Sequence, residues 1–115
     1  MSQTERVRHL NELGESAGAG GRWRYALDER CVLRVERKAR WRRGVDTEVA
    51  LRAAMIGTSY DGATETYSVL AGRSRTEAAP LFQSKGRLDA MRAELLLAHV
   101  RSECLAAADE KETPR

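Results

Sequence analysis

The side chains that could perform acid–base or nucleophilic chemistry are few in this chain and lie far apart in the sequence. The two histidines are His9, in the N-terminal helical pattern, and His99, which has Glu103 four residues further along a second helical pattern. A single His–Glu pair on a helix is typical of a surface contact and does not indicate a metal site or a general base. The segment from Ser59 to Gly62 favours a turn, because no strand-to-helix transition follows it as in a nucleophile elbow. The sequence therefore predicts no catalytic residue, no metal site and no cofactor, and we expect a protein that is not an enzyme.

The two cysteines, Cys31 and Cys104, are separated by most of the chain and belong to no CxxC pair. The N-terminal residues contain no apolar run typical of a signal peptide, and no segment approaches the roughly 18 apolar residues of a membrane span. We therefore expect a cytoplasmic protein in which both thiols are reduced and structural, with no membrane partner.

The cationic side chains concentrate in the first half of the chain, where residues 37–43 hold five of the 20 Lys and Arg residues together with Trp41. Sheet surfaces that combine cations with aromatic rings bind single-stranded nucleic acid through phosphate contacts and base stacking. The cations expected on one outer sheet face are Arg22, Arg24, Arg34, Lys38, Arg40, Arg42 and Arg52. The aromatic residues of the same segment have the opposite parity, however, and the acidic residues Glu36, Asp46 and Glu48 share the outer face and can pair with the cations. A nucleic-acid-binding module is therefore the alternative function, because the formal net charge of +3 gives only weak attraction to a polyanion.

The elements that must position these side chains follow from a shared parity. Between Arg22 and Ala71 most of the apolar residues have odd sequence numbers, and this parity continues through several turns, while their even-numbered neighbours are mostly charged or hydroxylated. Because side chains alternate between the two faces of a strand, this parity predicts one sheet with one buried face. The residues that follow the rule are Trp23, Tyr25, Leu27, Cys31, Leu33, Val35, Ala39, Trp41, Val45, Val49, Leu51, Ala53, Met55, Tyr67, Val69 and Ala71.

The turns between the strands agree with the parity. Four strands are predicted, at about 22–27, 31–41, 45–56 and 65–72. A three-residue loop places Leu27 opposite Cys31. A second such loop places Trp41 opposite Val45, with Gly44 supplying the positive φ that the loop needs. With an Asp-Gly turn before the last strand, the sequence predicts a four-stranded antiparallel meander.

Helical patterns flank the predicted sheet. Residues 3–16 predict a short amphipathic helix with Ser2 as its N-cap, and a flexible Gly-rich linker follows it to residue 21. Residues 85–108 predict a long helix capped by Ser84, and residues 109–115 predict a disordered charged tail. We therefore expect an α+β fold with a helix and linker at 1–21, a single α+β domain at 22–108, in which the long helix packs on one sheet face, and a tail at 109–115.

The long helix carries two apolar stripes, whereas a helix on one open sheet has only one face to bury. The first stripe, expected to cover the sheet, consists of Leu88, Met91, Leu95, Ala98 and Leu105. The second stripe, expected to be the partner-binding site, consists of Leu96, Leu97, Val100 and Cys104. Its cover would be the N-terminal helix, a second copy of the chain or a different protein.

The apolar surplus of the long helix is harder to leave in water than an arginine-rich face. The sequence therefore favours a small regulatory or adaptor protein that binds another protein and forms a homodimer. By inserting the second stripe into an apolar groove of its target, it would block the target's own assembly.

Overall fold

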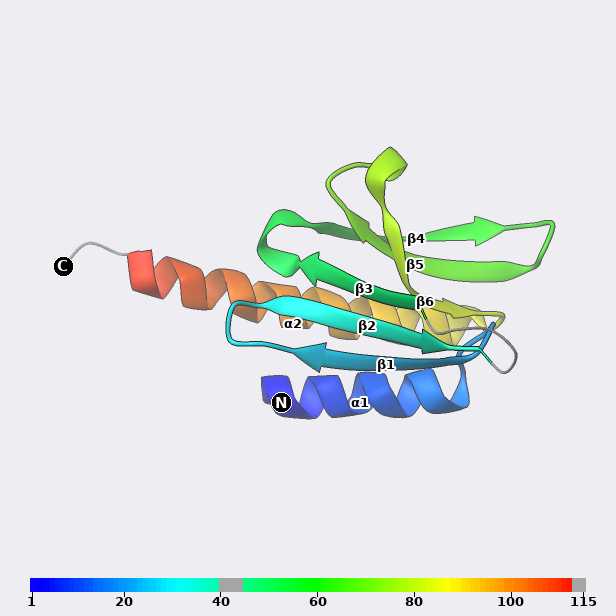
Figure 1. Cartoon of the computed structure of the whole chain (residues 1–115), viewed down its shortest axis with the longest axis horizontal. Coiled ribbons are helices and arrows are strands. Elements are labelled where there is room, and N and C mark those ends of the chain that lie inside the picture. The colour runs from blue at the N-terminus through cyan, green and yellow to red at the C-terminus, as the bar shows by residue number, and fades with distance from the viewer. Residues whose placement is uncertain (40–44, 113–115) are drawn as a thin grey trace.

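The computed structural model describes residues 1–39 and 45–112, and these contain two α-helices and six strands. In chain order the elements are α1 (Gln3–Ser16), β1 (Arg22–Leu27), β2 (Val32–Lys38), β3 (Val45–Ala50), the 3-10 turn η1 (Leu51–Ala53), β4 (Met55–Asp61), β5 (Thr66–Gly72), the 3-10 turn η2 (Arg75–Glu77), β6 (Ala79–Ser84) and α2 (Arg87–Glu112). The strands form two antiparallel three-stranded sheets, ordered β1-β2-β3 and β4-β5-β6. In Figure 1, α2 runs behind the first sheet and α1 lies beside β1. The α+β class is confirmed, but the single four-stranded meander is wrong.

The predicted third strand, 45–56, is divided in the structure at η1. Leu51 is fully buried there, and its backbone N–H donates to the carbonyl of Cys31 at 3.1 Å. The chain therefore turns out of the first sheet, and residues 57–61, predicted as part of a turn, continue β4 in the second sheet. Ala53 and Met55 consequently lose the buried parity, and Met55 is 71% exposed.

Strand β6 was not predicted because its burial does not alternate. Its register against β5 shifts between Val69 and Leu70, so the consecutive residues Leu81 and Phe82 are both buried. Pro80 is also an unfavourable residue within a strand, since proline cannot donate to a ladder. A β-bulge of this kind interrupts the alternation of buried and exposed residues, so the sequence shows no period-two pattern there.

The turn between β1 and β2 is two residues longer than predicted, because Leu27 pairs with Leu33 rather than with Cys31. The carboxylate of Asp28 accepts the backbone N–H of Val32 at 3.0 Å, and this hydrogen bond lowers the pKa of Asp28. Cys31 takes a positive φ of 59° to complete the turn. The register therefore shifts, but by an even number of residues, so the same face of each strand stays buried.

The connection between β2 and β3 is also longer than predicted. Val45 pairs with Arg37, whereas the three-residue loop would have paired it with Trp41. Trp41 and Gly44 themselves lie outside the described residues. This shift is again even, which preserves the parity.

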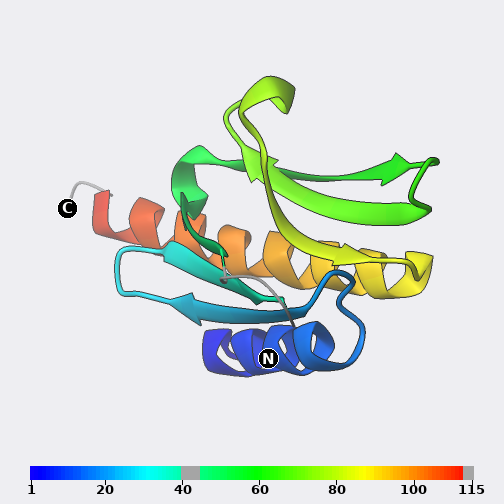
Figure 2. The same ribbon diagram turned by 45° about the vertical axis from the view of Figure 1, so that its right-hand side comes forward.

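The core lies between the two sheets and α2 (Figure 2). The parity residues that are buried, as predicted, are Trp23, Tyr25, Leu33, Val35, Val49, Leu51, Val69 and Ala71. The Tyr25 hydroxyl donates to the Leu81 carbonyl at 2.6 Å, which joins the first sheet to β6, and burial raises the pKa of this phenol well above its usual value. The Trp23 ring meets Phe82 edge-on, with centroids 6.4 Å apart. Packing between β1 and β6 thus closes one side of the core.

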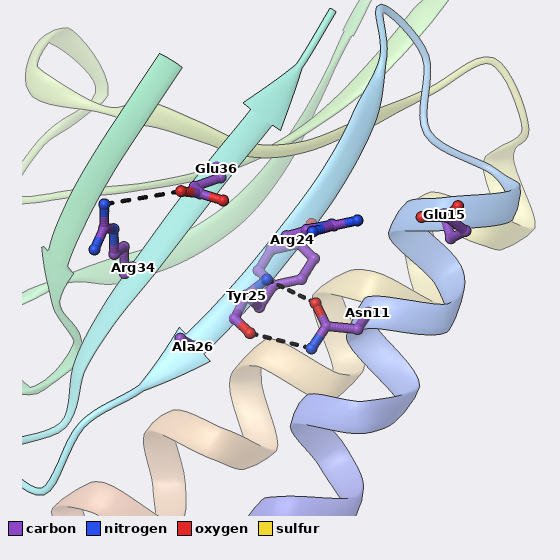
Figure 3. A pocket seen from close by; sticks show the side chains of 7 residues that line it. All are labelled: Asn11, Glu15, Arg24, Tyr25, Ala26, Arg34 and Glu36. Atoms are coloured by element: carbon purple, nitrogen blue, oxygen red, sulfur yellow. Dashed lines mark hydrogen bonds and ion pairs between the residues drawn. The ribbon is translucent and has the colours of Figure 1, made fainter. Parts of the chain in front are cut away.

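Helix α1 is an integral part of the fold. Ser2 caps it as predicted, since its hydroxyl oxygen accepts the backbone N–H of Glu5 at 3.1 Å. Asn11 binds the free edge of β1 from the helix: its amide oxygen accepts the N–H of Tyr25 at 2.7 Å, and its amide nitrogen donates to the Tyr25 carbonyl at 3.1 Å (Figure 3). Gly14, in the last turn of α1, lies close to β1, because a Cβ there would collide with the Trp23 carbonyl.

The two cysteines form a disulfide, with the Cα atoms of Cys31 and Cys104 5.9 Å apart. The prediction of reduced thiols is therefore wrong in the structure. The bond joins the β1–β2 turn to α2, two segments separated by 73 residues in the chain. Nothing in the sequence pattern revealed it, because the spacing of two distant cysteines carries no geometry.

Helix α2 differs in its ends from the prediction. It begins at Arg87, and the hydroxyl of Ser84 accepts the N–H of Gly86 just before it. It continues to Glu112, so residues 109–112, expected in a disordered tail, are helical, and residues 113–115 lie outside the described residues. In the described part of the chain, neither helix combines the length and the apolar character that crossing a bilayer would require.

Candidate binding surfaces

The outer face of the first sheet carries the arginines predicted from the sequence, together with their acidic neighbours. Arg34 lies 3.0 Å from the carboxylate of Asp46 and 3.8 Å from that of Glu36, and the hydrogen bond to Asp46 raises the pKa of Arg34. Arg22 lies 3.2 Å from Glu15 of α1. Arg34 is therefore paired with two of the acidic residues that the sequence placed on this face, and Arg22 is paired with α1.

Four of the seven predicted nucleic-acid-binding cations share this face, namely Arg22, Arg24, Arg34 and Lys38. Arg52 is exposed but belongs to η1, away from the strands of the first sheet. Arg40 and Arg42 lie outside the described residues. The rings of Trp23 and Tyr25 are buried on the opposite face, so they are not available for base stacking.

A shallow cavity of about 410 Å³ lies where this face meets α1 (Figure 3). It is lined by Asn11, Glu15, Arg24, Tyr25, Ala26, Arg34 and Glu36. Its two arginines are matched by two glutamates, and the amide of Asn11 is already used by β1. The cavity therefore lacks the excess of positive charge that would hold a phosphate.

The predicted partner-binding stripe of the long helix lies inside the protein. Leu97 and Val100 are fully buried, Cys104 is 1% exposed, and Leu96 is half-buried against the same core. The prediction that these residues form an exposed apolar surface is therefore wrong. Of the covers considered for them, the one observed is intramolecular.

The physical reason is the size of the residues facing the sheets. At its N-terminal half, α2 turns Ala90 and Ala93 toward the core, and both are almost completely buried. Small side chains allow the helix backbone to approach the sheets closely. Sequence reasoning assigned that role to the larger Leu88 and Leu95, which are on the other side of the helix.

The exposed side of α2 presents three large apolar side chains, which we call the α2 stripe. Leu88, Met91 and Leu95 are 69%, 50% and 59% exposed, and their spacing of three and four residues places them on one face. The exposed cations Arg87 and Arg92 lie on the two sides of this stripe. The sequence shows that these residues are apolar. The parity of the strands could not show whether they lie on the buried or on the exposed side of the helix.

A groove between the two helices continues the α2 stripe. Its volume is about 410 Å³, and it is lined by Met1, His9, Glu12, Leu13, Ser16, Arg92, Leu95 and Leu96. His9 lies 3.6 Å from the carboxylate of Glu12, at the polar side of the groove. Leu95 belongs to both features, so the stripe and the groove form one surface.

The acidic residue expected beside His99 on α2 is used in an ion pair with α1. Glu103, which the sequence placed within reach of His99, lies 3.6 Å from Arg6 of α1 instead. Within residues 1–39 and 45–112, no three His, Cys, Asp or Glu side chains come together in a way that would hold a metal ion.

Comparison of the chain with protein-family models, with curated proteins and with solved structures finds no match. The proposed function therefore rests on the surfaces of the structure.

Proposed function

We propose that this protein is a small, non-enzymatic regulator or adaptor that binds another protein through the α2 stripe. The observation that carries the proposal is the exposure of Leu88, Met91 and Leu95 on one face of a helix whose other face is fully used in the core. A contiguous apolar patch with a polar border is typical of a protein-interaction site. It replaces the buried residues 96–104 as the proposed partner-binding site.

The chemistry of the partner follows from the groove and from the charges beside it. A groove between two helices, with apolar anchors at helical spacing, suits an amphipathic helix of the partner. Arg87 and Arg92 border the stripe, so carboxylates flanking the apolar face of that helix would be complementary. If the partner uses the same helix for its own assembly, binding here blocks that assembly by competition.

The proposal also concerns the cell compartment in which the protein acts. The cytoplasmic placement expected from the sequence assumed reduced thiols, and disulfides are rare in the reducing cytoplasm. We infer that the protein acts where the Cys31–Cys104 bond persists. Trapping free thiols with an alkylating agent at the moment of cell lysis measures this directly, and alkylation of both cysteines in the native protein would contradict it.

Replacing the α2 stripe with serines should abolish partner binding without unfolding the protein. The triple variant Leu88→Ser, Met91→Ser and Leu95→Ser removes exposed side chains, so the free energy of unfolding should change little. Each lost anchor should weaken partner binding by about tenfold or more. The measurement is affinity recovery from the native cell extract, with the partner identified by mass spectrometry and its affinity measured by titration.

The matched control for this experiment lies on the first sheet. Arg24→Ser alters an exposed cation that belongs neither to the stripe nor to the groove beside it, and it should leave recovery of the partner unchanged. Partner binding that survives the triple variant would contradict the proposed surface. A wild-type protein that recovers no partner in stoichiometric amount would contradict the proposed function.

The nucleic-acid alternative makes a different prediction for the outer face of the first sheet. Because Glu36 and Asp46 pair with Arg34 on that face, we expect no measurable binding of labelled single-stranded or double-stranded DNA or RNA at low salt. The measurement is fluorescence anisotropy across a salt titration. Binding that falls steeply with salt and is lost in Arg22→Ser, Arg24→Ser and Arg34→Ser together would favour the alternative, since phosphate contacts release counterions.

A further inference from the structure

Strand β4 is an edge strand whose outer side lies open. It pairs with β5 only, and no described segment makes a backbone hydrogen bond to the other side of residues 55–61. Residues 58–61 are all exposed, and a Cβ built on Gly57 would meet no atom within 4 Å. In Figure 2, β4 lies along the border of its sheet.

This edge lacks the features with which proteins protect edge strands. Residues 55–60 contain no charge and no proline, and they include the β-favouring residues Ile56, Thr58 and Tyr60. The edge of β1, by contrast, is covered by α1, and Asn11 satisfies both backbone groups of Tyr25. An open edge strand whose first six residues carry no charge is a template for pairing with another strand.

We propose that β4 pairs with β4 of a second copy of this chain, in antiparallel fashion, with Thr58 on the two-fold axis. This register uses all seven residues of the strand. It sets Ile56 of each copy opposite Tyr60 of the other, and Thr58 opposite Thr58. Aromatic with β-branched and Thr with Thr are favourable cross-strand pairs. Since an isologous contact must be self-complementary, a strand that matches itself in this way fits a second copy better than an unrelated segment.

The side chains that meet would lie on one face of the joined sheet. Ile56, Thr58 and Tyr60 stand opposite Ala71, Val69 and Tyr67 in the β4–β5 register, so they share one side of the sheet. Tyr60 and Tyr67 already pack together, with ring centroids 4.6 Å apart. Ile56 of the second copy would extend this aromatic pair.

The charges at the two ends of β4 favour the antiparallel direction. Asp61 and Glu65 are exposed at its C-terminal end, and Arg52 is exposed just before its N-terminal end. Antiparallel pairing brings the acidic end of one copy beside the basic end of the other, whereas parallel pairing would bring like charges together. The product is one continuous six-stranded sheet, ordered β6-β5-β4-β4-β5-β6. The α2 stripe is not part of it, so this inference is independent of the proposed function.

The test is the mass of the protein in solution and its response to charge at position 58. By sedimentation equilibrium, the wild type should have twice the chain mass of 12.8 kDa. Thr58→Lys places two lysines directly opposite each other across the axis, with their Cα atoms about 5 Å apart, and Thr58→Glu does the same with two glutamates. Each variant alone should dimerise at least about tenfold more weakly, and an equimolar mixture of the two should recover a dimer.

Three controls make the outcome decisive. Thr58→Val keeps a neutral β-branched residue at the axis and should remain a dimer. The triple serine variant of the α2 stripe should also remain a dimer, which separates this interface from a dimer formed by α2. Thr58→Cys should give a covalent dimer on oxidation even if a charged variant fails to fold. A wild-type protein that is monomeric at high micromolar concentration, or charged variants that are not rescued by mixing, would overturn the proposal.

Discussion

Reduction of the Cys31–Cys104 disulfide is expected to lower the free energy of unfolding by about 4 kcal/mol, since the bond closes a loop of 73 residues. The bond acts mainly on the unfolded chain, because it limits the conformations that the chain can adopt. In the folded protein it fixes the β1–β2 turn to α2. The measurement is urea denaturation of the wild type with and without a non-thiol reductant, followed by circular dichroism.

The matched control is the double variant Cys31→Ala and Cys104→Ala. It has no bond to lose, so its denaturation midpoint should not respond to the reductant, and it should resemble the reduced wild type apart from the small cavity left at the buried Cys104. Equal midpoints for the oxidised and reduced wild type would show that the bond contributes nothing. The mass of the intact protein establishes the oxidation state of each sample independently.

The parity of the strands was predictable from the sequence because it depends only on neighbouring residues. Trp23, Leu33, Val49 and Val69 are buried as predicted, although both connections in the first sheet are longer than expected. Each register shift is an even number of residues, and an even shift returns every side chain to its original face. The buried face of each strand is therefore predicted correctly even where the length of the turn is not.

The division into two sheets was not predictable in the same way. The odd-numbered residues from Val49 through Leu51 to Met55 are all apolar, but the chain turns at Leu51. What makes it turn is a distant contact, the hydrogen bond from the Leu51 N–H to the Cys31 carbonyl, and the burial of Leu51 in the core shared with α2. No local pattern contains that information. The pairing of Cys31 with Cys104 was inaccessible for the same reason.

The candidate site shows the same limit. Sequence reasoning found that α2 has more apolar surface than one sheet can bury, and it placed the arginines of β1 and β2 on a solvent face with their acidic partners. It could not decide which side of α2 is buried, because both sides carry apolar residues at helical spacing. That choice depends on how closely the sheets approach the helix, which is a property of the assembled core.

A pair of leucines two positions apart on α2 tests which side of the helix is buried. Leu97→Ala is expected to lower the free energy of unfolding by about 2 to 5 kcal/mol, because it removes a fully buried side chain and leaves a cavity in the core. Leu95→Ala is expected to change it by no more than about 0.5 kcal/mol, since Leu95 is 59% exposed. Both variants replace the same residue type in the middle of the same helix, so differences in helix propensity cancel. Chemical denaturation of the two variants gives the comparison. A larger loss in the free energy of unfolding for Leu95→Ala than for Leu97→Ala would mean that Leu97 is exposed, and it would contradict the α2 stripe as a binding site.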